Sequence, residues 1–160
     1  MIDGPYFVLT LLAALGSGLI AGVFFAFSTS IMRALAALPP AQGIAAMQKI
    51  NVVIINPWFL GAFMITAVLA AVVAVVTFVL WPDHGRIELL LGCALYLVGS
   101  FGVTAAANVP RNDALAKLDP QAPESAEKWK TYVAEWTSWN HVRTGAAVAA
   151  CVSFILGLAA

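Results

Sequence analysis

Four long apolar stretches dominate the pattern of hydrophobic and polar positions along the chain. They cover residues 6–27, 57–81, 87–107 and 142–160, and charged side chains occur only near their edges. Each has about the 20 residues that a helix needs to cross a hydrocarbon core roughly 30 Å thick. The pattern predicts an all-α protein, an integral membrane four-helix bundle.

The connections between these stretches differ in length. Residues 82–86, with the sequence Pro-Asp-His-Gly-Arg, join the second stretch to the third, and such a short turn allows only an antiparallel hairpin. The other two connections, residues 28–56 and 108–141, are long and contain apolar residues at helical spacing. We therefore expect short amphipathic helices in both long loops.

In the first long loop, apolar residues continue the first helix until Pro39 and Pro40 end it. A short helix should follow, and Pro57 suits the first turn of the second span. The apolar residues that predict these two segments are Met32, Leu35 and Leu38, then Ile44, Met47, Ile50 and Ile54.

In the second long loop, Asn108, Pro110 and Asn112 predict a break in the third helix, and a new helix is expected to begin near Glu124. One face of that helix gathers residues at i, i+3, i+4, i+7 and i+11, which are Trp129, Tyr132, Val133, Trp136 and Asn140. Such a helix either lies in the membrane interface or leads straight into the fourth span.

Composition supports a membrane setting. The 160 residues are 62% hydrophobic and 10% charged, against about 45–50% and about 25% in soluble domains. The length suits one transmembrane domain over residues 1–160, with the lipid bilayer as its partner. A net charge of zero argues against nucleic-acid binding, which needs a basic patch.

Positive charges predict the orientation, because cytoplasmic loops collect lysine and arginine. Only Arg86 lies on the side of the short turn, whereas the side of the long loops carries Arg33, Lys49, Arg111, Lys117, Lys128, Lys130 and Arg143. We expect cytoplasmic long loops and outside termini, in a bacterial inner membrane. Asp3 stands where a signal peptide would be basic, so residues 6–27 are expected to form a retained span.

Small residues allow helices to approach closely. They lie in the first and third stretches, at Gly16, Gly18, Gly22, Gly92, Gly99, Ser100 and Gly102. They fit either packing within one bundle or self-association into a homo-oligomer. Cys93 and Cys151 lie in apolar stretches and are expected to be buried hydrophobes, and no pattern of metal ligands is present.

Polar side chains concentrate where the helices meet the long loops. These are Ser28, Arg33, Gln48, Asn51, Asn56, Asn108, Asn112, Asn140, His141 and Arg143. Unpaired amides are costly in an apolar bundle, so they either form a hydrogen-bonded network around a pocket or cap broken helices. His141, at a helix start and after Trp139, is a candidate proton acceptor near pH 7, or else an interfacial histidine bonded to a carbonyl.

Four motifs in order resemble the anthrone oxygenase-like family of small four-span membrane proteins. They are Gly22-Val23-Phe24-Phe25-Ala26-Phe27-Ser28 with Met32, Met47-Gln48-x-Ile50-Asn51 before Asn56-Pro57, Asn108-x-Pro110-x-Asn112, and Trp136-x-x-Trp139-Asn140-His141-x-Arg143. The resemblance covers essentially the whole chain. It implies oxidation of an apolar aromatic anthrone by dioxygen without a metal or organic cofactor.

On this resemblance, His141 would remove a proton from the substrate, and Arg143 would offset the negative charge that forms. Amides would hold the developing oxygen anion: Asn108, Asn112 and Asn140. The substrate pocket would be formed by Phe25, Ser28, Gln48, Asn51, Asn56, Trp136 and Trp139.

Two alternatives remain open from the sequence. A single histidine such as His141 suffices as the axial ligand of a haem. The same polar network would also serve a non-enzymatic protein, in which it stiffens a small bundle that assembles with itself or with a membrane partner.

Overall fold

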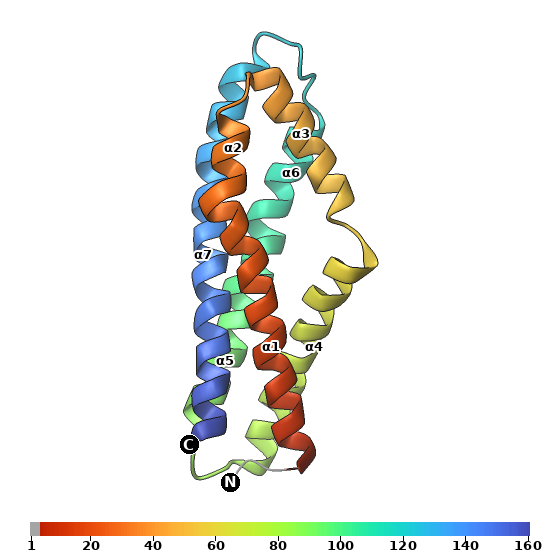
Figure 1. Ribbon diagram of the computed structural model, residues 1–160. Helices are drawn as coiled ribbons and strands as arrows, with labels where there is room; N and C mark the ends of the chain where they lie inside the picture. Colours follow the sequence, from red (N-terminus) through yellow and green to blue (C-terminus); the bar gives the residue numbers. More distant parts are fainter. Residues whose placement is uncertain (1–3) are drawn as a thin grey trace.

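Four long helices form an antiparallel bundle in the computed structural model, which describes residues 4–160 (Figure 1). The first helix is continuous through α1(Gly4–Ala26), η1(Phe27–Ile31) and α2(Met32–Ala36). The second is α4(Pro57–Leu80). The third comprises α5(Arg86–Ala94), η2(Leu95–Gly102), η3(Thr104–Asn108) and α6(Val109–Ala116), and the fourth is α7(Ser125–Ala159). All four are long and apolar enough to cross a membrane, so the predicted four-helix membrane bundle is confirmed.

Around the bundle, α1 packs between α7 and α4, and α5 packs between the same two helices on the opposite side. The short helix α3(Pro40–Val53) packs against α2, α6 and α7 at the end of the long loops. Figure 1 shows α3 leaning away from the bundle axis until it meets α4 at a protruding corner. Asp3 lies outside the described residues.

The local signals explain where α4 begins and ends. The side-chain oxygen of Asn56 accepts hydrogen bonds from the amides of Trp58 and Phe59, both at 3.0 Å, and Pro57 occupies the first turn. At the other end, Trp81 and Gly85 adopt left-handed φ angles of 43° and 75°. The chain reverses there, which confirms the predicted hairpin.

The predicted break in the third helix is wrong, because α6 follows η3 without interruption. Pro110 is the second residue of α6 and directly follows η3, so it lies where the regular α-helical hydrogen-bond pattern is already interrupted. The preceding turn is a π-helical segment in which the Val109 amide donates to the Thr104 carbonyl. The Arg111 guanidinium also donates to the Ala107 carbonyl at 2.9 Å, so this carbonyl near the proline is satisfied.

The structure also shows how the aromatic helix of the second long loop connects to the fourth span. α7 runs without interruption from Ser125 to Ala159, so the aromatic segment leads straight into the fourth span. Three of its aromatic residues, Trp129, Tyr132 and Trp136, face inward and are buried.

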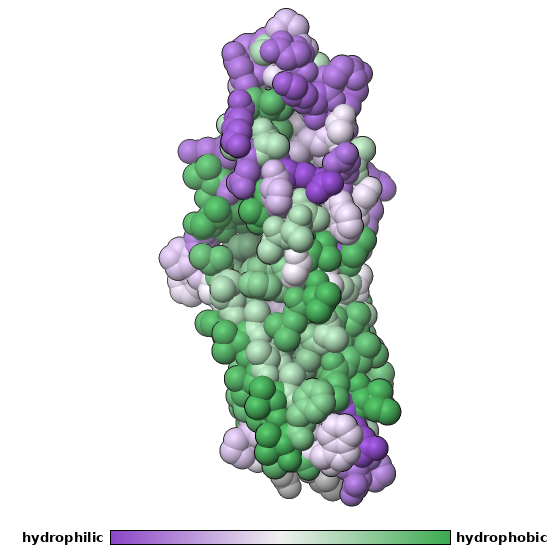
Figure 2. Space-filling model, turned by 180° about the vertical axis from the view of Figure 1, so that it is seen from behind, coloured by the Kyte–Doolittle hydropathy of each residue, from purple (hydrophilic) through white to green (hydrophobic). Residues whose placement is uncertain are grey.

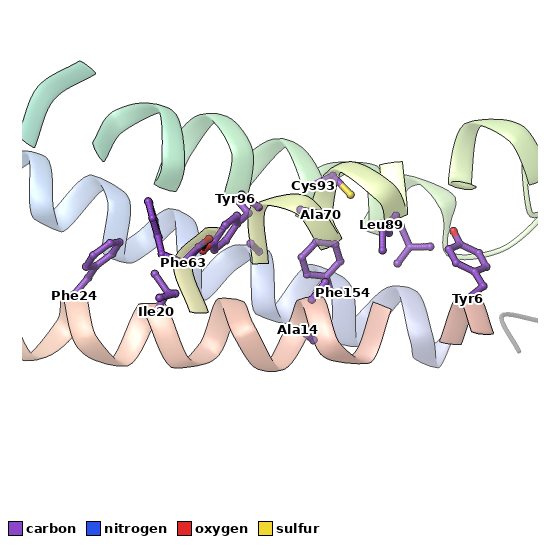
Figure 3. Close-up of a cluster of buried hydrophobic side chains, with 14 residues drawn as sticks. Tyr6, Ala14, Ile20, Phe24, Phe63, Ala70, Leu89, Cys93, Tyr96 and Phe154 are labelled. Atoms are coloured by element: carbon purple, nitrogen blue, oxygen red, sulfur yellow. Dashed lines mark hydrogen bonds between the residues drawn. The ribbon is translucent and has the colours of Figure 1, made fainter. Parts of the chain in front are cut away.

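Two hydrophobic cores lie one above the other along the bundle. The membrane core gathers residues from all four helices and is drawn in Figure 3, with Phe63, Tyr96 and Phe154 among its largest members. The second core lies at the long-loop end and includes Phe27, Met32, Ile44, Met47, Leu115, Trp129, Tyr132 and Trp136. The polar layer described below lies between them.

The outer surface of the bundle is strongly apolar. Figure 2 shows a broad hydrophobic band over most of the length of the molecule and a hydrophilic cap at the end that carries the long loops. The exposed side chains of the band include Leu15, Leu19, Ile65, Val75, Val98 and Ile155. Such a band has the character of a surface that faces lipid.

Candidate functional site

A layer of polar side chains crosses the bundle between its two cores. Asn140, Arg143 and Thr144 occupy positions i, i+3 and i+4 of α7, and all three are buried. Ser28 of η1 and Asn108 of η3 are buried beside them. Because these residues come from helices far apart in sequence, only the packed bundle brings them together.

Asn140 holds this layer together. Its amide nitrogen donates to the Phe24 carbonyl at 2.8 Å and to the Ser28 hydroxyl at 2.6 Å. Its side-chain oxygen accepts a hydrogen bond of 2.8 Å from the Nε of Arg143. With donors and acceptor all used, Asn140 fixes the position of the guanidinium.

Arg143 is the most unusual residue of the layer. Its side chain is nearly buried, with 6% of its surface exposed. Its Nη1 donates to the Thr104 hydroxyl at 3.2 Å, and its guanidinium carbon lies 3.9 Å from the ring centroid of Phe24 and 5.0 Å from that of Trp136. Among residues 4–160, no carboxylate forms an ion pair with it. A buried cation without a counter-ion is costly and suits a site that binds an anion.

Arg143 faces a cavity of about 230 Å³ at the long-loop end. The cavity lies between the end of α1 with η1, α3, the start of α4, η3 with α6, and α7, and its walls are mostly aromatic and aliphatic. The polar lining comprises Asn51, Thr104, Asn112 and Arg143, and the apolar lining includes Phe24, Phe27, Phe59, Phe63 and Trp136. An apolar pocket with a few convergent polar groups is typical of a small-molecule site.

The polar side chains around the cavity offer mainly hydrogen-bond donors to a ligand. Asn112 uses its side-chain oxygen to accept from the Tyr132 hydroxyl at 3.0 Å and from the indole nitrogen of Trp136 at 2.8 Å. The buried amide nitrogen of Asn51 forms no hydrogen bond of good geometry with any described residue, although the Asn51 side chain lies beside the Tyr132 hydroxyl. Together with the Arg143 guanidinium, this free donor favours a ligand oxygen that carries negative charge.

The structure brings together part of the predicted site. Asn51, Asn112, Trp136 and Arg143 all line the cavity. Asn140 accepts a hydrogen bond from Arg143 and donates one to Ser28. Asn108 donates from its amide nitrogen to the Trp136 carbonyl at 3.2 Å. Whether these side chains act on a substrate stays a prediction.

His141 lies elsewhere, and the expectation that it faces the asparagines is wrong. It is exposed on α7, next to the buried Asn140. One residue turns a helix by about 100°, so neighbours along the chain face different directions. From this position His141 does not reach the cavity as its base or as a haem ligand within it.

Besides Ser28, four other predicted pocket residues lie outside the cavity. Phe25 is 58% exposed and points away from it, whereas its neighbour Phe24 points inward. Trp139 is exposed, with the Arg111 guanidinium over its ring. Gln48 donates to the carbonyls of Leu115 and Leu118, and Asn56 caps α4, so both have structural roles.

Sequence reasoning missed several lining residues. Thr104, Phe59 and Phe63 belong to no motif that separates them from an ordinary core. Phe24 and Phe27 belong to the first of the four motifs, but only Phe25 of that motif's aromatic residues was assigned to the pocket. Tyr132 does not line the cavity but donates to Asn112, which does, and the sequence had placed it on the same helix face as Trp136. The π-helical segments that shift the phase of the helices had no recognisable sequence signal.

Within the part of the chain that the structure describes, no three side chains of histidine, cysteine, aspartate or glutamate converge. Cys93 is buried and Cys151 is half-buried, and neither is in a disulfide.

Comparisons with known proteins add one finding. A family model described as anthrone oxygenase matches residues 55–153, which is more than half of the chain. The matched segment includes α4, the whole third helix and most of α7, and hence Thr104, Asn112 and Arg143. Searches of curated proteins and of solved structures found no match.

Proposed function

The chain belongs to the anthrone oxygenase family, and from this premise we propose that it is a membrane-embedded oxygenase that oxidises an apolar aromatic substrate of the anthrone type with dioxygen. The substrate would occupy the cavity beneath α3, with its rings against Phe24, Phe63 and Trp136. A cavity of about 230 Å³ suits a small planar molecule better than a lipid.

The observation that carries this proposal is the buried Arg143, which faces an aromatic cavity without an acidic partner among residues 4–160. Anthrones have a methylene group between two aryl rings and opposite a carbonyl. Loss of a proton from this methylene places negative charge on the carbonyl oxygen, as an enolate. A guanidinium held in a desolvated site stabilises such an oxygen anion strongly, because it needs no reorganisation during the reaction.

The chemistry balances without a further reactant. The methylene loses a proton to a water molecule inside the cavity, and the resulting carbanion reduces dioxygen and forms a carbon–oxygen bond. The peroxide anion takes up a proton, and the hydroperoxide then loses water to give the carbonyl. In sum, a CH₂ group and O₂ become a C=O group and H₂O.

The roles of the chain's residues in this scheme follow from their positions. Arg143 would hold the enolate oxygen, with the free amide of Asn51 as a second donor. Asn140 and Thr104 would position the guanidinium. The proposal needs no resident cofactor, because the carbanion itself reduces dioxygen; a Soret band in the purified protein would contradict this and indicate haem.

Oxygen uptake tests the proposal. The protein in lipid nanodiscs should consume oxygen with emodin anthrone faster than the spontaneous rate. Arg143→Met should lower kcat/KM by roughly 10²–10³, because one charged donor to the oxygen anion is removed. Arg143→Lys should lower kcat/KM by less, because it keeps the positive charge. It should still lower kcat/KM, because lysine lacks the planar guanidinium that Asn140 and Thr104 position.

His141→Ala is the matched control, because His141 lies two positions from Arg143 on an exposed face. It should keep kcat/KM within about twofold. Thermal unfolding of each variant separates loss of the site from loss of the fold. No oxygen uptake above the spontaneous rate, or full activity in folded Arg143→Met, would reject the proposed function and favour a structural role for the polar layer.

A further inference from the structure

The cavity has a mouth on the side of the bundle. Three of its lining residues are also exposed on the outer surface: Ile55 at 69%, Leu60 at 43% and Val109 at 44%. Ile55 and Leu60 belong to the corner between α3 and α4, whereas Val109 begins α6. Figure 2 shows the recess beside this protruding corner, within the apolar band. The opening therefore lies between the corner and α6.

The depth of the mouth follows from helix lengths. With a rise of about 1.5 Å per residue, about 20 residues of helix cover a hydrocarbon core of roughly 30 Å. Counted from Leu80 at the short-turn end of α4, this length ends at Leu60. Counted from Arg86 along the third helix, it ends near Ala106, three residues before Val109. Both sides of the mouth thus lie at the long-loop edge of the hydrocarbon core.

The surface around the mouth is apolar and suits contact with lipid. The corner exposes Val52, Val53, Ile55 and Trp58, of which Trp58 is 89% exposed. An exposed tryptophan at this depth is typical of the membrane interface. A cluster of exposed aliphatic side chains here would be costly in water and is stable against acyl chains.

We propose that the substrate enters the cavity sideways from the bilayer, through the mouth formed by Leu60 and Val109. This inference rests on the proposed function and adds the substrate class. The substrate is a planar molecule that partitions into the membrane and carries an oxygen atom at the end that enters the cavity first. The rings slide between aliphatic side chains at the mouth, and the oxygen meets Arg143 and Asn51 inside.

Blocking the mouth tests the proposal. In a chain with Cys93→Ala and Cys151→Ala, single cysteines are placed by Leu60→Cys or Val109→Cys. Each is labelled in nanodiscs with bulky N-cyclohexylmaleimide or with small methyl methanethiosulfonate. The matched control is Val75→Cys, which is exposed on α4 and does not line this cavity. Two readouts are taken: oxygen uptake with emodin anthrone, and the rate at which unreactive anthraquinone quenches the fluorescence of the cavity-lining Trp136. For the second readout, the exposed Trp58, Trp81 and Trp139 are replaced by phenylalanine.

The bulky label at Leu60→Cys or Val109→Cys should slow both readouts at least tenfold relative to the same unlabelled variant. The small label should slow them much less, and either label at Val75→Cys should have no effect. Equal quenching rates with and without the bulky label, or no quenching by anthraquinone at all, would overturn the lateral entrance. Blocked quenching in a protein that never turns over anthrone would support the entrance and reject the proposed function.

Discussion

At the scale of single residues, the difference between Arg143 and His141 is the most instructive. Two positions on one helix separate them, which is about 200° around its axis. Arg143 therefore faces the cavity, whereas His141 is exposed. From the sequence, the chemistry of imidazole made His141 the stronger candidate for a catalytic residue. Its position around the helix axis places it outside the cavity.

Asn112 provides a prediction at this scale. Its side-chain oxygen is the acceptor for two donors, the Tyr132 hydroxyl and the Trp136 indole. Asn112→Ala leaves both donors without this acceptor and should lower the free energy of unfolding by about 2 kcal/mol. Tyr132→Phe removes one hydrogen bond without leaving a donor unpaired and should cost about 1 kcal/mol.

The comparison can be made by SDS unfolding titrations of both variants in the same lipid-detergent mixture. The order of the two effects is the informative result. If Tyr132→Phe destabilised the protein more than Asn112→Ala, the acceptor role of Asn112 would be incorrect.

At the scale of elements, small residues set how closely the helices pack. A Cβ added at Gly99 of η2 would lie 2.6 Å from the Cβ of Ala146 on α7, and one added at Gly92 would lie 2.9 Å from the Phe154 ring. Gly16 similarly contacts Thr66 of α4. These glycines thus pack within the bundle. Gly22, by contrast, is exposed and has no atom within 4 Å of an added Cβ.

This contrast gives a matched pair of variants. Gly99→Ala should push η2 away from α7 and lower the free energy of unfolding by about 1–3 kcal/mol. Gly22→Ala meets no obstacle and should leave stability unchanged or raise it by up to about 1 kcal/mol, because glycine is unfavourable inside a helix. Thermal unfolding of both variants measures the difference; equal stability would show that η2 and α7 can move apart freely.

The third helix shows why elements were only partly predictable. Pro110 and the flanking asparagines indicated a break, yet α6 continues from η3. A proline interrupts a regular α-helix, but here a π-helical turn precedes it and the Arg111 side chain satisfies a nearby carbonyl. Such compensation depends on packing and on side chains that local propensity does not describe.

At the scale of the whole molecule, charge predicts orientation. Arg143 is buried in the bundle, which leaves six positive residues toward the long-loop side, against Arg86 at the short turn. The six are Arg33, Lys49, Arg111, Lys117, Lys128 and Lys130. This imbalance still favours cytoplasmic long loops.

Reporter fusions in a bacterial host test this orientation. Alkaline phosphatase fused after Ala160 should be active and green fluorescent protein at the same position should be dark, because both ends are expected outside the cytoplasm. The same reporters fused after Lys117, in the second long loop, should give the opposite result. The reverse pattern would place the cavity and its mouth at the other leaflet.

The sequence by itself determined the number of spans, the tight hairpin, the helix that begins near Glu124 and the family resemblance. These features follow from the length of apolar stretches, from turn residues and from the order of motifs. They do not depend on how the helices pack against one another. It also indicated the end of the bundle at which the polar side chains gather.

Only the tertiary structure decided which of those side chains face one another. It buried Arg143 beside Asn140 and Thr104, exposed His141 and Phe25, and assigned Gln48 and Asn56 to structural hydrogen bonds. The physical reason is that a side chain's direction depends on helical phase, which the π-helical turns shift, and on the neighbours that each helix meets. The cavity exists only where α3 leans away from the bundle, and no single segment of the chain encodes that gap.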